Sequence, residues 1–128
     1  DAIPENSPMV GIYSCLLQSS TDYNMVLTCD MPFVNEALIR YLADRMNGNK
    51  IIVPVHHGGL MEPLCAIYPT RAAGSLKETI RHRHFTLRDY ILSQPNTQVV
   101  ISGRMSFWSE ELFANINTRG DLESYLSE

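Results

Sequence analysis

The chain has 128 residues, of which 45% are hydrophobic and 19% are charged. This length and composition suit one compact domain, residues 1–128, and differ from those of disordered proteins. A formal net charge of −4 argues against a nucleic-acid partner, and the lack of a membrane-spanning apolar run argues against a membrane partner. The three cysteines, Cys15, Cys29 and Cys65, lack metal-type spacing, so we expect buried free thiols in the reducing cytoplasm.

The first expected elements are a helix and a strand. Residues 8–20 predict a helix, because Ser7 can cap its start and a proline such as Pro8 is tolerated in the first turn. The apolar run 24–29 has no helical period and is flanked by Asp and Pro. It predicts a buried strand of a parallel sheet.

A second helix and a strand pair are expected next. Asn35 can cap a helix whose apolar positions recur at helical spacing, and Gly48 ends it. Residues 50–55 predict a short strand, and residues 61–68 continue as an extended segment. A turn at residues 57–59 would join the two into a hairpin.

The remaining chain continues the alternation of helix and strand. Residues 71–81 and 86–93 favour helices, and residues 98–102 favour a strand. Residues 103–111 are expected to be irregular, and Thr118 can cap a final helix. This order is typical of an α/β fold, in which ligands bind at the carboxyl ends of the strands.

Asp30 is the first candidate for a functional residue. It follows the apolar strand 24–29 directly and precedes a Met-Pro pair, so its carboxylate is expected in the crevice above the sheet. Mg²⁺ in proteins usually takes one or two carboxylates and completes its shell with water and phosphate oxygens. A turn-forming aspartate is the alternative interpretation.

Asn115 and Asn117 form the second candidate group. If they lie at a strand end, their alternate positions place both amides on the same side. Amides can donate to phosphate oxygens and accept from ligand hydroxyl or amino groups. The alternative is that one of them merely caps or turns the chain before the last helix.

These motifs occur in the order PMVGIYSCL, MVLTCDMPF, EPLCAIY and FANINTRGDL. In order and spacing they resemble the molybdenum cofactor guanylyltransferases over nearly the whole chain, and parts of the pattern also resemble cytidylyl and sugar-nucleotide transferases. CDMPF combined with NINT about eighty residues later is the specific part of the resemblance. It implies a Rossmann-like, three-layer α/β nucleotidyltransferase fold with a mostly parallel sheet.

The resemblance also implies an activity and a set of site residues. The activity is Mg²⁺-dependent transfer of GMP from GTP to molybdopterin, with pyrophosphate released. Asp30 matches the family's magnesium-binding aspartate, and Asn115 and Asn117 match its paired asparagines near the metal and the acceptor. Asp1, with one residue of spacing different, and Gly11 match positions that contact the nucleotide. Glu62 matches a segment along the cleft, although it reads equally well as an ordinary strand carboxylate.

One departure from the family is large. The family's glycine-rich loop, whose amides cradle the triphosphate and whose lysine neutralises charge, has no counterpart in this sequence. We therefore expect a fragment whose amino-terminal part is missing, with little or no transfer by this chain alone and with self-association or a partner chain. The alternatives are a non-catalytic nucleotide- or pterin-binding module, and a cytidylyl or sugar-phosphate nucleotidyltransferase.

Several other residues are weaker candidates for a functional site. The pairs His56–His57 and His82–His84 could suggest a metal site, but histidines without a third ligand are more often surface residues. The basic stretch 81–84 could meet a phosphate of the acceptor or form a solvated loop. An exposed Phe107 or Trp108 could stack on a flat ring, although core packing is the stronger expectation for both.

Overall fold

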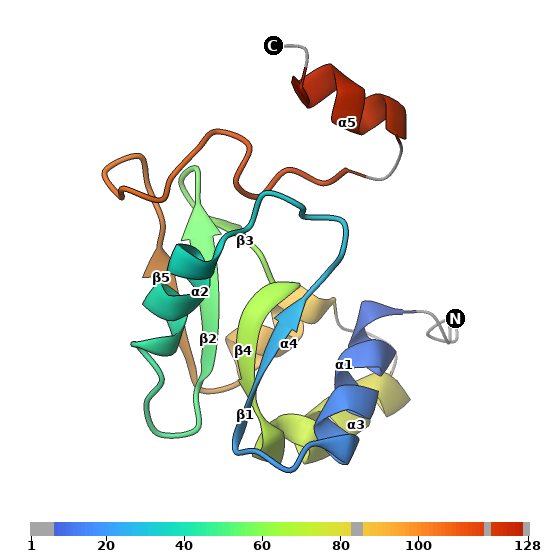
Figure 1. Cartoon of the computed structure of the whole chain (residues 1–128). Coiled ribbons are helices and arrows are strands. Elements are labelled where there is room, and N and C mark those ends of the chain that lie inside the picture. Colours follow the sequence, from blue (N-terminus) through green and yellow to red (C-terminus); the bar gives the residue numbers. More distant parts are fainter. Residues whose placement is uncertain (1–6, 83–85, 117–118, 127–128) are drawn as a thin grey trace.

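The computed structural model describes residues 7–82, 86–116 and 119–126, and the structural statements below concern these ranges. The elements in chain order are α1 (Pro8–Gln18), β1 (Tyr23–Leu27), α2 (Glu36–Ala43), β2 (Ile51–His56), β3 (Leu60–Met61), β4 (Cys65–Pro69), the 3-10 helix η1 (Thr70–Ala72), α3 (Ala73–His82), α4 (Leu87–Ser93), β5 (Asn96–Val100) and α5 (Arg119–Leu126). The sheet stands between α2 on one face and α1 and α3 on the other, as expected for an α/β fold (Figure 1).

The sheet is mixed, and the expectation of a mostly parallel sheet is wrong for the described strands. The strand order is β1-β4-β2-β3, and β5 also pairs with β2. Only the β2–β5 pairing is parallel, whereas β4 runs antiparallel to both β1 and β2. The reason is local, because a connection as short as residues 57–64 can join only antiparallel neighbours. The hairpin predicted here is confirmed, with β3 pairing along the end of β2.

Two apolar cores lie on opposite faces of the sheet, because successive side chains of a strand point to opposite faces. Ile51 and Val53 of β2 join the core beneath α1, α3 and α4, while Ile52 between them joins the core beneath α2. β4 is shared in the same way, and every residue of β2 and β4 is buried. The result is a three-layer domain whose two central strands are fully covered.

The predicted caps of the first two helices are confirmed. The Ser7 hydroxyl accepts a hydrogen bond from the Met9 amide at 3.3 Å, and Pro8 opens α1. The Asn35 side chain accepts from the Leu38 amide at 3.0 Å. The second helix ends at Ala43, earlier than the expected stop at Gly48, whose positive φ of 59° instead shapes the turn before β2.

β1 differs from the buried parallel strand that its sequence suggested. Four of its residues are half-buried and Leu27 is 45% exposed, because β1 is an edge strand that pairs only with β4 among the described strands. An apolar run without period therefore marked an edge strand here, not a central one.

Residues 101–116 lie beyond β5 and carry no regular element, so residues 103–111 are irregular as expected, while the strand expected at 98–102 is Asn96–Val100. α5 follows this segment, while its predicted cap Thr118 lies outside the described residues. Within the described ranges, no helix has the length and apolar character needed to cross a bilayer.

Asn35 links this segment to the start of α2, and loss of the Asn35 side chain should have a measurable effect on stability. Besides capping α2, its side-chain amide donates to the Phe107 carbonyl at 3.2 Å. We expect Asn35→Ala to lower the free energy of unfolding by about 1–2 kcal/mol, because both the cap and the link are lost. Asn35→Asp keeps an oxygen for the cap and should lose less in urea-induced unfolding. Equal losses for the two variants would contradict the capping role, and an unchanged stability of Asn35→Asp would contradict a role for the Phe107 contact.

Candidate active site at the carboxyl ends of the strands

β1, β2 and β5 run in the same direction, since β4 is antiparallel to β1 and β2 and β5 is parallel to β2. Their carboxyl ends therefore meet at one end of the sheet, where α/β proteins bind ligands. Asp30 lies in the turn just beyond β1 and is half-buried. The next residue, Met31, is only 5% exposed and packs into the core under α2, which fixes the turn that carries Asp30.

The structure joins the two motifs that the sequence singled out. The Ile116 amide donates to the Asp30 carbonyl at 2.6 Å, so the segment that carries Asn115 lies against the Asp30 turn. Asn115 itself is exposed. Residues 114–116 form no strand, so the argument that strand alternation aims both asparagines to one side is wrong. Asn117 lies outside the described residues.

The Asp30 carboxylate is free to take a ligand. Its one polar contact among the described residues is weak, with the Cys29 thiol 3.8 Å from Oδ1. Among the described residues, no cluster of three or more His, Cys, Asp or Glu could cage a metal ion. A half-exposed carboxylate with unused oxygen lone pairs nevertheless fits Mg²⁺, which keeps water and phosphate oxygens as its other ligands.

The two remaining predicted nucleotide contacts are less informative. Gly11 lies exposed on α1 beside an open apolar groove of about 300 Å³ that also includes Ile12, Leu27 and Leu64. A Cβ added at Gly11 would meet no atom within 4 Å, so packing among the described residues does not require glycine there. Asp1 lies outside the described residues.

Sequence reasoning missed a buried pair at the same end of the sheet. His56, the last residue of β2, is 8% exposed, and its Nε2 lies 2.6 Å from Oε2 of Glu62. The carboxylate can only accept, so Nε2 carries the proton of this bond. His56 Nδ1 is enclosed and has no partner among the described atoms. The expectation of surface histidines is wrong for His56, because β2 is central and its end is covered.

Phe113 is the residue that covers His56. The two rings stack with centroids 4.4 Å apart and an interplanar angle of 26°. Because Phe113 lies two residues before Asn115, the His56–Glu62 pair supports the segment that reaches Asp30. The family resemblance points to Glu62, but nothing in the sequence points to His56 as its partner, because the burial of His56 depends on Phe113, more than fifty positions later.

An open pocket of about 600 Å³ adjoins this pair at the ends of β2 and β5. His57 and Trp108 line it, and their rings meet edge to face with centroids 5.6 Å apart. His57 adopts a left-handed φ of 46°, which is uncommon for a residue other than glycine. Trp108 and Phe107 pack partly against the core under α2, which confirms the core-packing interpretation of these aromatics.

A family model described as a MobA-like NTP transferase domain matches residues 1–97. The chain belongs to this family. A protein of Pelotomaculum thermopropionicum, named "Probable molybdenum cofactor guanylyltransferase", is 31% identical over 123 residues, covering 95% of this chain and 60% of its own length. A protein of the same name from Methanosarcina mazei is 30% identical over 128 residues, with coverages of 98% and 57%.

A solved structure agrees with the MobA-like assignment. Molybdopterin-guanine dinucleotide biosynthesis protein A from Archaeoglobus fulgidus superposes with a TM-score of 0.74 at 26% identity, covering 91% of this chain and 59% of that one. This chain therefore spans about 57–60% of the length of these relatives. The family and the nucleotidyltransferase fold are established by these matches.

The cysteines of this MobA-like domain are not all buried, which corrects the sequence expectation. Cys15 and Cys29 are exposed, and only Cys65 is buried. Burial, followed by the charge of Glu62, raises the pKa of the Cys65 thiol from 9.0 to about 12. We expect two thiols to react with a chromogenic disulfide reagent at pH 8 and the third only after unfolding, since the thiolate is the nucleophile.

The raised pKa also has a consequence for stability. The unfolded thiol loses its proton at lower pH than the folded one, so this contribution to stability is full below about pH 9 and is lost towards pH 12.

In the Cys65→Ala variant, all remaining thiols should react without denaturant. Rapid reaction of three thiols in the native protein would contradict the burial of Cys65.

Proposed function

We propose that this chain carries the metal-binding and acceptor-side residues of an enzyme that transfers GMP from GTP to molybdopterin. The observation that supports this most directly is the 2.6 Å hydrogen bond from the Ile116 amide to the Asp30 carbonyl. This bond places the segment that carries Asn115 beside the residue whose carboxylate would bind the metal. Both lie at the end of the sheet where nucleotide sites form in α/β proteins. Membership in the MobA-like family and the names of the relatives support the same activity.

In this proposal each residue has a defined task. Asp30 holds Mg²⁺ against the GTP phosphates, and Asn115 and Asn117 orient the acceptor with their amide groups. The bound ion would neutralise charge on the phosphates. A terminal phosphate oxygen of molybdopterin forms a bond to the α-phosphorus of GTP while the bond from that phosphorus to the bridging oxygen breaks, and pyrophosphate leaves with its electron pair. Positioning and charge neutralisation supply most of such catalysis.

The proposal retains the expectation that this chain needs a phosphate loop. Glycine-rich loop amides supply the remaining neutralisation in the family, and the sequence contains none. The test is a protein that joins a glycine-rich phosphate-binding loop to this chain, assayed for pyrophosphate release with Mg²⁺ and molybdopterin in the cytoplasmic pH range. Release with GTP, and not with CTP, supports the proposal.

Two results of that assay would overturn the proposal. Equal release with CTP would instead favour a cytidylyltransferase. Tight nucleotide binding without release, in a joined protein that is folded by circular dichroism, would favour the binding module. The same assay on the chain alone should show little or no release.

Self-association or a partner chain is part of the same proposal. The outer edge of β1 pairs with no strand in the described ranges, and Leu27 of β1 and Leu17 of α1 are 45% and 61% exposed. Free strand edges and exposed apolar side chains favour association. Sedimentation of the chain across a concentration series tests this, and a monomer at every concentration would oppose it.

A further inference from the structure

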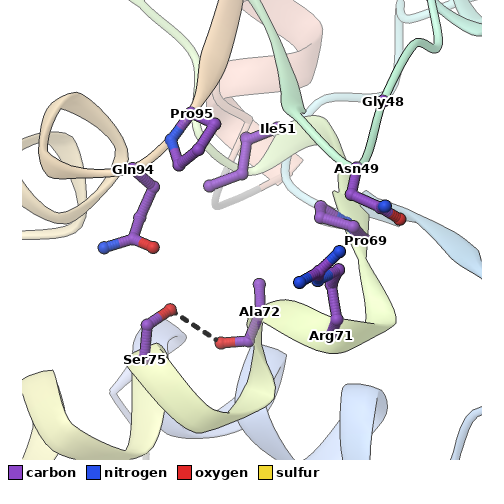
Figure 2. Close-up of a pocket in the computed structure, with 9 residues that line it drawn as sticks. All are labelled: Gly48, Asn49, Ile51, Pro69, Arg71, Ala72, Ser75, Gln94 and Pro95. Carbon is purple, nitrogen blue, oxygen red and sulfur yellow. Dashed lines mark hydrogen bonds between the residues drawn. The ribbon is translucent and has the colours of Figure 1, made fainter.

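A second pocket lies at the opposite end of the sheet from Asp30. It has a volume of about 360 Å³ and is formed where β2 and β5 begin and β4 ends (Figure 2). Its lining residues are Gly48, Asn49, Ile51, Pro69, Arg71, Ala72, Ser75, Gln94 and Pro95. Since β1, β2 and β5 carry the candidate active site at their other ends, this pocket is separate from it.

The charge of this pocket is unusual for an acidic protein. The chain has a net charge of −4, yet no Asp or Glu lines the pocket. Arg71 is exposed and makes no hydrogen bond or ion pair with any residue in the described ranges. By contrast, Arg40, Arg81 and Arg119 each lie against a glutamate of the same helix. The Arg71 guanidinium therefore keeps all its donors for a ligand.

Two amide side chains add donors around Arg71. Figure 2 shows Asn49 on the same side of the pocket as Arg71, with Gln94 across from them. The Asn49 side chain has no partner among the described residues. Its backbone has a left-handed φ of 62°, and its amide donates a hydrogen bond to the Tyr23 hydroxyl at 2.8 Å. Gln94 donates to Ser93 at 3.2 Å, which leaves its second amide hydrogen free.

The walls of the pocket are fixed by bonds that do not involve a ligand. The Ser75 hydroxyl donates to the Ala72 carbonyl at 3.0 Å and lies 2.8 Å from the Tyr90 hydroxyl, so it is already used. Tyr90 is fully buried. Ile51, Pro69, Ala72 and Pro95 supply an apolar lining. The pocket thus combines the unpaired guanidinium of Arg71 and amide donors with an apolar surface that suits a short carbon skeleton.

We propose that this pocket binds a small metabolite through an oxyanion, which Arg71 grips together with the amides of Asn49 and Gln94. Guanidinium pairs with carboxylate or phosphate oxygens in a two-pronged geometry, and neutral amides complete the shell without adding charge. Phosphate and carboxylate share this chemistry. The proposal is independent of the transferase activity, because it uses no residue from the carboxyl ends of the strands.

The test is a titration of the ¹⁵N-labelled chain, followed by amide and side-chain NMR shifts at constant ionic strength. Inorganic phosphate is the first probe and malonate the second, so their relative affinities distinguish a phosphate ligand from a carboxylate ligand. We expect saturable shifts at Asn49, Arg71 and Gln94 with at least one probe. Arg71→Gln should weaken binding at least about tenfold, as expected for the loss of a charge-assisted bond.

Two further variants make the test specific. Arg81→Gln makes the same charge change on α3, away from the pocket, and should leave the affinity unchanged. Asn49→Gly keeps the left-handed backbone and removes only the amide, so it should weaken binding by several-fold without loss of fold. Non-saturating shifts, or equal weakening by Arg71→Gln and Arg81→Gln, would overturn the proposal.

Discussion

Replacing Asp30 by asparagine is expected to reduce nucleotidyl transfer by at least about 100-fold in a protein that joins this chain to a phosphate-binding loop. Asparagine keeps the shape of the side chain but loses the negative charge that Mg²⁺ requires from its protein ligand. The structure should be unaffected, because within the described ranges the carboxylate makes only the weak 3.8 Å contact to the Cys29 thiol. The loss should therefore appear in the rate and in magnesium affinity, and not in the free energy of unfolding.

The control is Asp44→Asn, which makes the same charge change at an exposed residue just after α2. Pyrophosphate release at several Mg²⁺ concentrations provides the measurement. The Asp30 variant should need far more Mg²⁺ for half-maximal rate, while the Asp44 variant should match the parent protein. Wild-type magnesium dependence in Asp30→Asn would remove Asp30 from the metal site.

The buried His56–Glu62 pair should show a large effect on stability. Glu62→Ala leaves the Nε2 proton of a histidine that is 8% exposed without its 2.6 Å acceptor. We expect a loss of about 1–3 kcal/mol in the free energy of unfolding, the cost of an unsatisfied buried donor. The Glu36–Arg40 pair has the same 2.6 Å distance but side chains that are 76% exposed. Glu36→Ala should therefore cost less than about 1 kcal/mol.

A double-mutant cycle separates the pair from its surroundings. In His56→Leu combined with Glu62→Ala, neither polar group remains buried alone, so the combined loss should be smaller than the sum of the single losses. Urea-induced unfolding provides the measurement, with fluorescence of Trp108 as a reporter near His57. Additive single losses would mean that the two residues do not stabilise each other.

Much of the secondary structure was predictable because it depends on neighbours in sequence. Ser7 and Asn35 cap helices through bonds to residues two and three positions later. The β2–β4 hairpin follows from a turn within residues 57–59. The place of β4 between β1 and β2 was not predictable from local pattern, since it depends on contacts between strands about forty residues apart. The edge position of β1 follows from the same order.

The candidate site was predictable in part for the same reason. Asp30 is a prediction from its position after an apolar run and from family resemblance, and the structure places the Ile116 segment against its turn. The burial of His56 was missed, because it depends on Phe113 and on the central position of β2. The pocket around Arg71 was missed too, since its walls come from several separate segments.

The reversed direction of β4 changes how the rim around Asp30 is built. β1, β2 and β5 run in one direction, so the residues that follow each of them contribute to this rim. β4 runs in the opposite direction, so the residues that precede it contribute, including Glu62 and Leu64. The Leu64 carbonyl accepts a hydrogen bond from the Thr28 amide at 3.0 Å, and the pairing of Leu27 with Cys65 fixes the position of β4 relative to β1. Insertions in the turn before β4 would therefore remodel the rim while leaving the Asp30 turn intact.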